Sequence, residues 1–189
     1  MGLGNPGPEY AATRHNAGFR LIDHLARAWG FPPFRRDRRA RVTAGDRLGR
    51  RVGLLKPATF MNRSGAALAP LAADPEFDAG TQLLVLVDDV ALALGRFRLR
   101  ARGGAGGHNG LRSVQGALQS QDYARLRIGV GPIPIGADDL ADFVLEQMTA
   151  AESAELDALL EPMTEAVECW LVDGIDTAMN RFNRSLEEM

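Results

Sequence analysis

The chain has 189 residues, a length that suits one domain with a substantial hydrophobic core, so we predict a single domain over residues 1–189. Hydrophobic residues make up 46% and charged residues 24%, as in ordinary soluble globular proteins, and no apolar run is long enough to span a membrane. The single cysteine, Cys169, excludes an internal disulfide, and with no basic-then-apolar leader we expect a cytoplasmic protein.

The formal net charge of −2 conceals two regions of opposite sign. Residues 1–134 contain 20 Arg or Lys and 10 Asp or Glu, whereas residues 135–189 contain 2 and 14, which gives net charges of +10 and −12. A phosphate-rich ligand would be attracted to the first region and repelled by the second. An acidic pair of C-terminal helices would produce the same imbalance, and the two explanations are compatible.

Three glycines near the start of the chain, Gly2, Gly4 and Gly7, have the G-x-G-x-x-G spacing of a dinucleotide-binding loop. That loop requires a full strand before it and a helix that opens directly at the glycines. Only Met1 precedes Gly2, and the prolines on both sides of Gly7 would break a helix there. We therefore expect a loop that passes close to a ligand, with the side-chain amide of Asn5 presented from the end of a short strand.

His15 lies in a polar turn, directly before a helical pattern that covers residues 17–30. Asn16 is a suitable N-cap for that helix. A single histidine in such a place is usually a capping or surface residue, but a second His-Asn pair, His108-Asn109, follows a later glycine-rich loop. The helix is expected to bury one stripe and to leave His24 solvated on the other side; the stripe comprises Phe19, Ile22, Leu25, Ala26 and Trp29.

Residues 35–41 carry five arginines and read as a solvated loop, in which a phosphate contact is only weakly indicated. Strands are expected near 40–44 and 51–56. The segment that follows, Phe60-Met61-Asn62-Arg63-Ser64-Gly65, leads into an Ala- and Leu-rich helix that extends to about Ala72, with Ser64 as its N-cap. Asn62 is either a second capping residue or an amide that faces a ligand.

Residues 83–87 form a continuous apolar run, as in a strand that is covered by helices on both faces. The run ends in Asp88, and because a carboxylate at the end of a buried strand needs a partner, we expect Asp88 to contact His15. Residues 96–100 alternate, so that three arginines share one face of an edge strand. Those arginines either protect the edge or face phosphates.

Residues 103–110 are rich in glycine and can bring backbone amides close to an extended ligand. A helix over 111–118, a buried strand over 125–131 and a loop over 132–136 are expected next. Thr149 and Glu152 predict a capping box, followed by a helix that packs through one apolar face and a last helix that extends to about Leu186. Alternating strands and helices without a repeat indicate an α/β domain.

Several of these motifs together resemble the signature of bacterial-type peptidyl-tRNA hydrolases. The matching segments occur in the family's order along essentially the whole chain, as Gly4-Asn5-Pro6-Gly7, Tyr10 to Gly18, Phe60 to Gly65, Gly104 to Leu111 and Asn180-Arg181. The resemblance implies a three-layer α/β/α sandwich around a mixed, mostly parallel sheet. It also implies a monomer that takes peptidyl-tRNA as its partner, through the acceptor stem and the 3′ end, and needs no membrane.

The usual hydrolase machineries are missing from this sequence. It has no G-x-S-x-G turn, no Walker loop and no metal-binding pattern of histidines or cysteine pairs, and Cys169 lies in a helical core pattern. We therefore expect neither a metal nor a cofactor. The remaining candidates are one imidazole, one carboxylate and three amides, which suit direct attack of water on an activated ester: His15, Asp88, Asn5, Asn62 and Asn109.

By resemblance, that ester joins a peptide to the 3′ ribose of tRNA, and its hydrolysis recycles the tRNA. His15 would be the catalytic base and Asp88 its partner. The residues expected to hold the peptide and the terminal adenosine are Asn5, Tyr10, Met61, Asn62, His108 and Asn109, while Arg98, Arg100 and Arg127 would meet phosphates. The family normally has a longer first strand, so the short one here weakens the expected placement of Asn5.

Two other functions remain open from the sequence. Non-catalytic RNA-binding relatives such as organellar splicing factors share the expected fold, although the His, Asp and Asn residues that such a protein would lose are present here. A nucleotide-dependent enzyme that uses the early glycines is the second alternative.

Overall fold

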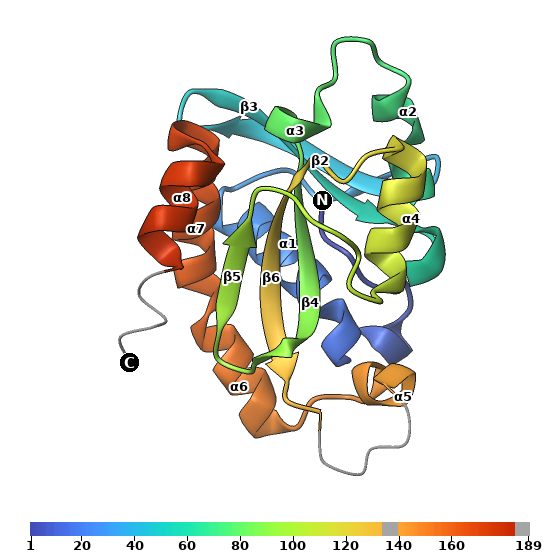
Figure 1. Ribbon diagram of the computed structural model, residues 1–189, viewed down its shortest axis with the longest axis vertical. Coiled ribbons are helices and arrows are strands. Elements are labelled where there is room, and N and C mark those ends of the chain that lie inside the picture. The colour runs from blue at the N-terminus through green and yellow to red at the C-terminus, as the bar shows by residue number, and fades with distance from the viewer. Residues whose placement is uncertain (134–139, 184–189) are drawn as a thin grey trace.

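The computed structural model describes residues 1–133 and 140–183. Its strands form two three-stranded groups (Figure 1). The first is an antiparallel meander of β1 (Arg35–Asp37), β2 (Ala40–Arg47) and β3 (Arg50–Pro57). The second has the order β4-β6-β5 and comprises β4 (Leu84–Ala93), β5 (Phe97–Arg100) and β6 (Ala124–Gly131). Strand β6 pairs with β4 in parallel and with β5 in antiparallel orientation.

The first three residues connect the two groups into one sheet. The amino group of Met1 donates to Leu84 O at 2.8 Å and Leu3 N donates to Leu86 O at 2.9 Å, so this segment runs parallel to β4. On its other side, Gly2 N donates to Leu55 O of β3 at 3.0 Å. The first residues therefore lie in the centre of the sheet, where Gly2 forms an isolated bridge in place of the expected short strand, and they lead directly to Asn5.

The prediction of an α/β sandwich around a mixed sheet is confirmed. The expectation that most strands are parallel holds only for the centre of the sheet, where the first residues, β4 and β6 run in one direction. The hairpins β1-β2 and β2-β3 and the pair β5-β6 are antiparallel. The connections β1-β2 and β2-β3 are tight turns, and such turns join antiparallel neighbours only.

Helices cover both faces of this sheet, which gives three layers; α1 lies behind β4 and β6 in Figure 1. The longer helices are α1 (Ala17–Ala28), α4 (Asn109–Leu118), α6 (Ala150–Ala158), α7 (Leu160–Asp173) and α8 (Ile175–Phe182). The shorter ones are α2 (Ala69–Ala72), α3 (Ala79–Gln82), α5 (Leu140–Leu145) and the 3-10 segments η1 (Pro8–Tyr10), η2 (Arg14–Asn16) and η3 (Met61–Leu68). None of the described helices is long and apolar enough to cross a membrane.

Alternate residues of β4 belong to two different cores, one on each face of the sheet. Leu84 and Leu86 join the core formed with α1 and α7, whereas Val85 and Val87 join the core formed with η3 and α4. This double burial explains why the strand reads as an uninterrupted apolar run. Helix α1 comes close to the strands at Gly18, where a Cβ would collide with the carbonyl oxygens of Leu3 and Leu86.

Several local predictions are corrected in the first third of the chain. Helix α1 ends at Ala28 and buries Leu21, while Phe19 is only half-buried. His24 is not solvated, because its Nε2 lies 3.1 Å from Glu161 Oε1 of α7. The arginine-rich segment includes the exposed edge strand β1 and is not a loop throughout.

The two predicted asparagine and serine caps are also wrong, whereas the capping box is correct. Asn16 makes no side-chain cap to α1, and Ser64 is buried inside η3. The side chain of Asn16 instead bonds to the backbone of Asn5, and Ser64 Oγ lies 3.9 Å from Met61 Sδ within η3. The box of Thr149 and Glu152 at the start of α6 is confirmed. The loop expected at the early glycines is present, since Gly7 has φ of 122° and leads only into the short 3-10 segment η1. The predicted loop over 132–136 lies partly outside the described residues, and the predicted helix end near Leu186 lies wholly outside them.

Candidate active site

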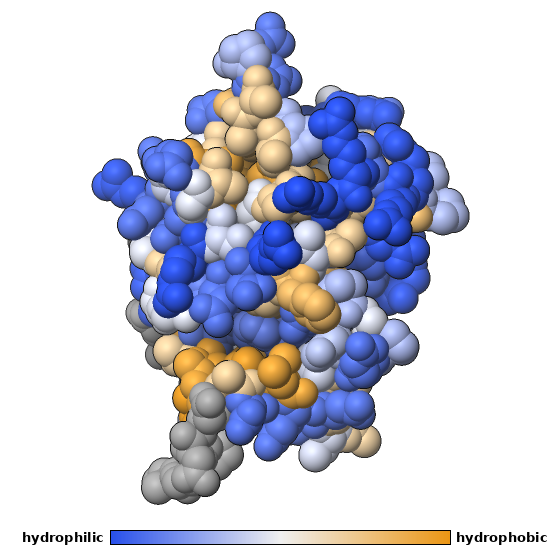
Figure 2. Space-filling model, turned by 90° about the vertical axis from the view of Figure 1, so that its right-hand side faces the viewer, coloured by the Kyte–Doolittle hydropathy of each residue, from blue (hydrophilic) through white to orange (hydrophobic). Residues whose placement is uncertain are grey.

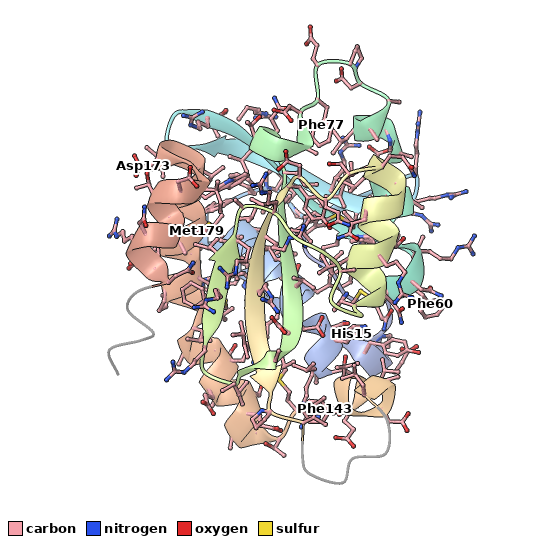
Figure 3. All side chains as sticks on the ribbon, in the orientation of Figure 1. His15, Phe60, Phe77, Phe143, Asp173 and Met179 are labelled. Atoms are coloured by element: carbon pink, nitrogen blue, oxygen red, sulfur yellow. The ribbon has the colours of Figure 1, made fainter. Side chains whose placement is uncertain are left out.

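His15 contacts Asp88, as expected from the sequence. His15 belongs to η2, and Asp88 follows the apolar part of β4; His15 Nδ1 and Asp88 Oδ2 are 2.8 Å apart. Asp88 is only 4% exposed. Figure 3 shows His15 between β4 and the beginning of α4. This contact leaves Nε2 as the remaining basic atom of the His15 ring.

His108 contacts the second oxygen of the same carboxylate, an arrangement that sequence reasoning did not find. Its Nε2 lies 2.9 Å from Asp88 Oδ1, and its Nδ1 accepts from Gly110 N at 3.1 Å and from Leu111 N at 3.2 Å. Because the two backbone donors require a lone pair on Nδ1, the ring proton of neutral His108 must be on Nε2. His108 therefore caps α4 and donates to Asp88 with one fixed tautomer.

Asp88 is held in its charged form by these two imidazoles. Burial alone would raise the pKa of Asp88, but the charge and hydrogen bond of His108, with those of His15, outweigh burial and hold the pKa well below its usual range. The ionised carboxylate accepts hydrogen bonds and donates none. His15 accordingly carries its proton on Nδ1 and presents the lone pair of Nε2.

His15, Asp88 and His108 are also the three described residues whose ligand atoms lie close enough together to hold a metal ion, within 4.8 Å of one another. The hydrogen bonds do not fit that use. A metal ligand needs a lone pair on the nitrogen that faces the carboxylate, and the cap of α4 places the proton of His108 there. The arrangement matches a hydrogen-bonded His-Asp-His chain.

Asn5 is fixed by contacts from two other segments. Its backbone N–H donates to Asn16 Oδ1 at 2.8 Å, and its backbone carbonyl accepts from Asn16 Nδ2 at 3.0 Å. Its side-chain Oδ1 accepts from Met61 N at 2.8 Å. With Oδ1 committed in this way, the Nδ2 group is the part of the Asn5 side chain left to act as a donor. Asn16 thus orients the loop that carries Asn5, which explains why it does not cap α1.

A cavity of about 680 Å³ opens beside the His-Asp-His chain. It brings together ten of the eleven residues that the sequence singled out. These are Asn5, Tyr10, His15, Met61, Asn62, Asp88, Arg100, His108, Asn109 and Arg127. Arg98 is the exception: it lies directly opposite Arg127 in the β5-β6 pair but is not part of the cavity lining.

The walls of the cavity include residues that sequence reasoning missed. Phe60, 57% exposed, packs edge-to-face against Tyr10 at 6.2 Å between ring centroids. Helix α5 adds an apolar wall that contains the exposed side chains of Leu140 and Leu145. Figure 2 shows apolar surface in the lower part of this face of the molecule. The signal for Phe60 that the sequence offers is its position directly before Met61-Asn62.

The basic wall is formed by Arg100, Arg102, Arg125 and Arg127. Two of them have structural partners. Buried Arg125 donates to Gly104 O at 3.0 Å and to Gln121 O at 3.3 Å, so it orders the glycine-rich loop, and Arg127 pairs with Asp89. Arg102 was not predicted, although it stands in the same run as Arg100.

Arg14 ties the segment that carries His15 to helices α5 and α6. Its Nη1 donates to Phe143 O and to Glu146 Oε2, both at 3.1 Å, and its Nη2 donates to Glu152 Oε1 at 2.7 Å. The guanidinium also lies 4.3 Å from the ring centroid of Phe143. These contacts fix the position of the apolar wall of α5 relative to His15, which follows Arg14 in the sequence.

Comparisons with known proteins show the family to which this chain belongs. The family described as peptidyl-tRNA hydrolase matches residues 1–189. A peptidyl-tRNA hydrolase of Gemmatimonas aurantiaca is 45% identical over 97% of this chain and 98% of its own length, and one of Chloroflexus aggregans is 46% identical over 97% of each. The crystal structure of peptidyl-tRNA hydrolase from Acinetobacter baumannii superposes with a TM-score of 0.88 at 35% identity, covering 96% of this chain and 92% of that one. The chain therefore belongs to the peptidyl-tRNA hydrolase family.

Proposed function

We propose that this protein hydrolyses the ester between a peptide and the 3′ ribose of tRNA, with His15 as the general base. The observation that carries the proposal is the pair of hydrogen bonds to Asp88. They leave His15 with a proton on Nδ1 and a free lone pair on Nε2, in a residue that lines the cavity. Histidine suits this role because its ordinary titration lies close to neutral pH.

In the first step, a water molecule attacks the carbonyl carbon of the ester. One proton of that water passes to Nε2 of His15 as the new C–O bond forms, and the carbonyl oxygen becomes an oxyanion. Asp88 stabilises the imidazolium that results, as the carboxylate does in catalytic triads. The donor Nδ2 of Asn5, together with the amides of Asn62 and Asn109, supplies hydrogen bonds to the oxyanion or the attacking water.

In the second step, the tetrahedral intermediate collapses and the bond to the ribose oxygen breaks. The imidazolium returns its proton to that oxygen, so that the products are a free peptide carboxylic acid and a tRNA with an unesterified ribose. No covalent enzyme intermediate is needed, because an aminoacyl ester is already reactive.

The cavity walls suit the two parts of such a substrate. Tyr10 and Phe60 offer aromatic surface on which the terminal adenine can stack. The apolar residues of α5 suit peptide side chains, and Arg100 and Arg102 suit the phosphates of the 3′ end.

We assign His108 a different role from the substrate contact expected from the sequence. Both of its ring nitrogens are engaged within the protein, with Asp88 on one side and the start of α4 on the other. His108 therefore acts as a positioning residue that orients Asp88.

Hydrolysis of an N-acetylaminoacyl-tRNA tests the proposal directly. The wild-type protein should release the N-acetylamino acid, and the His15→Ala variant should lose at least about 100-fold in kcat, because general base catalysis is worth that much. His24→Ala is the matched control, since His24 lies on α1 and pairs with Glu161. Full turnover by His15→Ala would refute the base assignment. Tight tRNA binding without any turnover by the wild type would instead identify a non-catalytic RNA-binding protein.

A further inference from the structure

The turn between β1 and β2 presents a group of exposed arginines that the proposed reaction does not use. We call it the arginine hairpin; its members are Arg35, Arg36, Arg38, Arg39 and Arg41. Asp37 is the one acidic residue within the segment. Within residues 1–133 and 140–183, no ion pair is recorded for any of the five arginines.

The arrangement of these arginines is unfavourable for the hairpin itself. Arg36 lies directly opposite Arg41 in the β1-β2 register, and like charges in opposite positions destabilise a strand pair. Arg38 has φ of 52° in the two-residue turn, a conformation that glycine or asparagine adopts more easily. Charge on the edge strand β1 would prevent aggregation, but that purpose requires neither the opposed pair nor the strained turn. An anionic partner would relieve the repulsion.

The hairpin is attached to the rim of the cavity. Ala58 N donates to Arg39 O at 2.8 Å, and two residues later Phe60 lines the cavity mouth. The exposed Arg63 follows in η3, where its carbonyl accepts from Thr59 Oγ1 at 3.0 Å. In Figure 1 the light-blue turn between β1 and β2 projects on the side of the molecule where α4 lies, and Figure 2 shows strongly hydrophilic side chains on this face.

The size of the cavity determines what lies outside it. A volume of about 680 Å³ is that of a pocket for one drug-sized ligand, so it suits the reacting ester and the terminal adenosine. The rest of a tRNA must extend over the rim. The acidic C-terminal region, with its net charge of −12, repels that polyanion, whereas the arginine hairpin attracts it.

We propose that the arginine hairpin and Arg63 bind phosphates of the double-stranded stem of the tRNA whose 3′ end occupies the cavity. This inference rests on the proposed function and names the part of the substrate that the hairpin recognises. The contacts are bidentate guanidinium-phosphate pairs, which recognise the backbone and not the base sequence. They raise affinity for tRNA and leave the chemical step unchanged.

The test compares two double variants with the same change in net charge. Arg36→Glu/Arg41→Glu alters the hairpin, and Arg50→Glu/Arg51→Glu alters the opposite end of the same strands, roughly 20 Å away along β2. Each is assayed with full-length N-acetylaminoacyl-tRNA and with an N-acetylaminoacyl ester of the short 3′ oligonucleotide CCA. We expect the hairpin variant to raise KM for the full-length substrate at least about tenfold at low salt and to lower the slope of log KM against log salt by roughly 1 to 2.

For the hairpin variant, kcat on both substrates and KM for the short ester should equal those of the wild type, and the control variant should be unaffected. Equal KM values for wild type and hairpin variant would show that the arginines only protect the edge strand. An equal rise in both variants would show an effect of overall charge. If the wild type hydrolyses neither substrate, the proposed function fails, and measured binding of unacylated tRNA to both variants still decides whether the hairpin contacts tRNA.

Discussion

The carboxylate of Asp88 receives one hydrogen bond on each oxygen, and the two donors come from distant parts of the sequence. His15 occupies Oδ2 and His108 occupies Oδ1. Because His108 holds Asp88 in place, the Asp88 carboxylate fixes both the tautomer and the rotation of the His15 ring. Asp88 is almost fully buried, so water cannot easily replace a hydrogen bond that a substitution removes.

At the scale of single residues, we first predict the effect of Asp88→Asn on catalysis. The substituted amide is of the same size, but one of its two positions becomes an N–H donor, which favours the wrong tautomer of His15. We expect kcat to fall by about two to four orders of magnitude while KM for N-acetylaminoacyl-tRNA changes little. Steady-state kinetics on both parameters check this. A variant that keeps more than half of the wild-type kcat would contradict the role of Asp88.

The His108→Asn variant separates the two contacts of His108. Asparagine is among the best N-caps, so it can still satisfy the start of α4, but its shorter side chain cannot also reach Asp88. We expect the free energy of unfolding to stay within about 1 kcal/mol of the wild-type value. We also expect kcat to fall at least about tenfold while KM for N-acetylaminoacyl-tRNA changes little, because Asp88 then holds His15 less firmly. A change in KM alone would instead indicate the substrate contact that the sequence suggested.

At the scale of elements, the contacts around Arg14 hold η2, α5 and α6 together. Glu152 is the most strongly bonded acidic partner, since it accepts from Thr149 N at 2.7 Å and from Arg14 Nη2 at 2.7 Å. The backbone hydrogen bond from Thr149, followed by that from Arg14, lowers the pKa of Glu152 below its ordinary value. Its partner acid Glu146 is 63% exposed and contributes less.

A lowered folded-state pKa gives a definite dependence of stability on pH. The contribution of Glu152 is fully present above the ordinary glutamate pKa of about 4.3 and is lost as the pH falls through its lower folded-state value. We predict that Glu152→Gln reduces the free energy of unfolding by about 1 kcal/mol at neutral pH, and that the difference from the wild type narrows below about pH 4. Urea denaturation of the wild type and the variant at several pH values measures this difference in the free energy of unfolding, with Glu146→Gln as the control. A difference that stays constant down to acidic pH would exclude the ionised contact.

The elements also show what a sequence can predict. The apolar run before Asp88 correctly predicts a buried strand, although β4 continues beyond Asp88 to Ala93. The contact of Asp88 with His15 follows from the sequence because an isolated buried carboxylate needs a partner. The contact of His108 with the same carboxylate depends on the path of a glycine-rich loop, which no local pattern specifies. Arg14 reaches residues more than 120 positions away in sequence. Asn16 was assigned to a helix cap because local patterns favour it, whereas the fold uses its amide to hold Asn5.

At the scale of the whole molecule, the division of charge along the sequence becomes a division in space. The acidic helices α6 and α7 pack with α1 on one face of the sheet, where the core contains Leu156 and Met163. Apart from the apolar wall of α5, the cavity lining and the arginine hairpin belong to residues 1–134. A polyanion is therefore directed to the cavity side by attraction there and by repulsion elsewhere.

This division predicts how salt acts on the wild-type protein. If phosphate contacts orient the tRNA, raising the salt concentration should lower kcat/KM for full-length N-acetylaminoacyl-tRNA through KM alone. With roughly three such contacts, a fivefold increase in salt should reduce kcat/KM by about 30- to 80-fold. The short CCA ester makes few of these contacts, so its kcat/KM should fall by less than about fivefold over the same range. Because Asp88 and both histidines are largely shielded from solvent, kcat should remain constant for both substrates. Parallel salt dependences for the two substrates would mean that the molecule recognises only the 3′ end, and the charge division would then serve solubility instead of recognition.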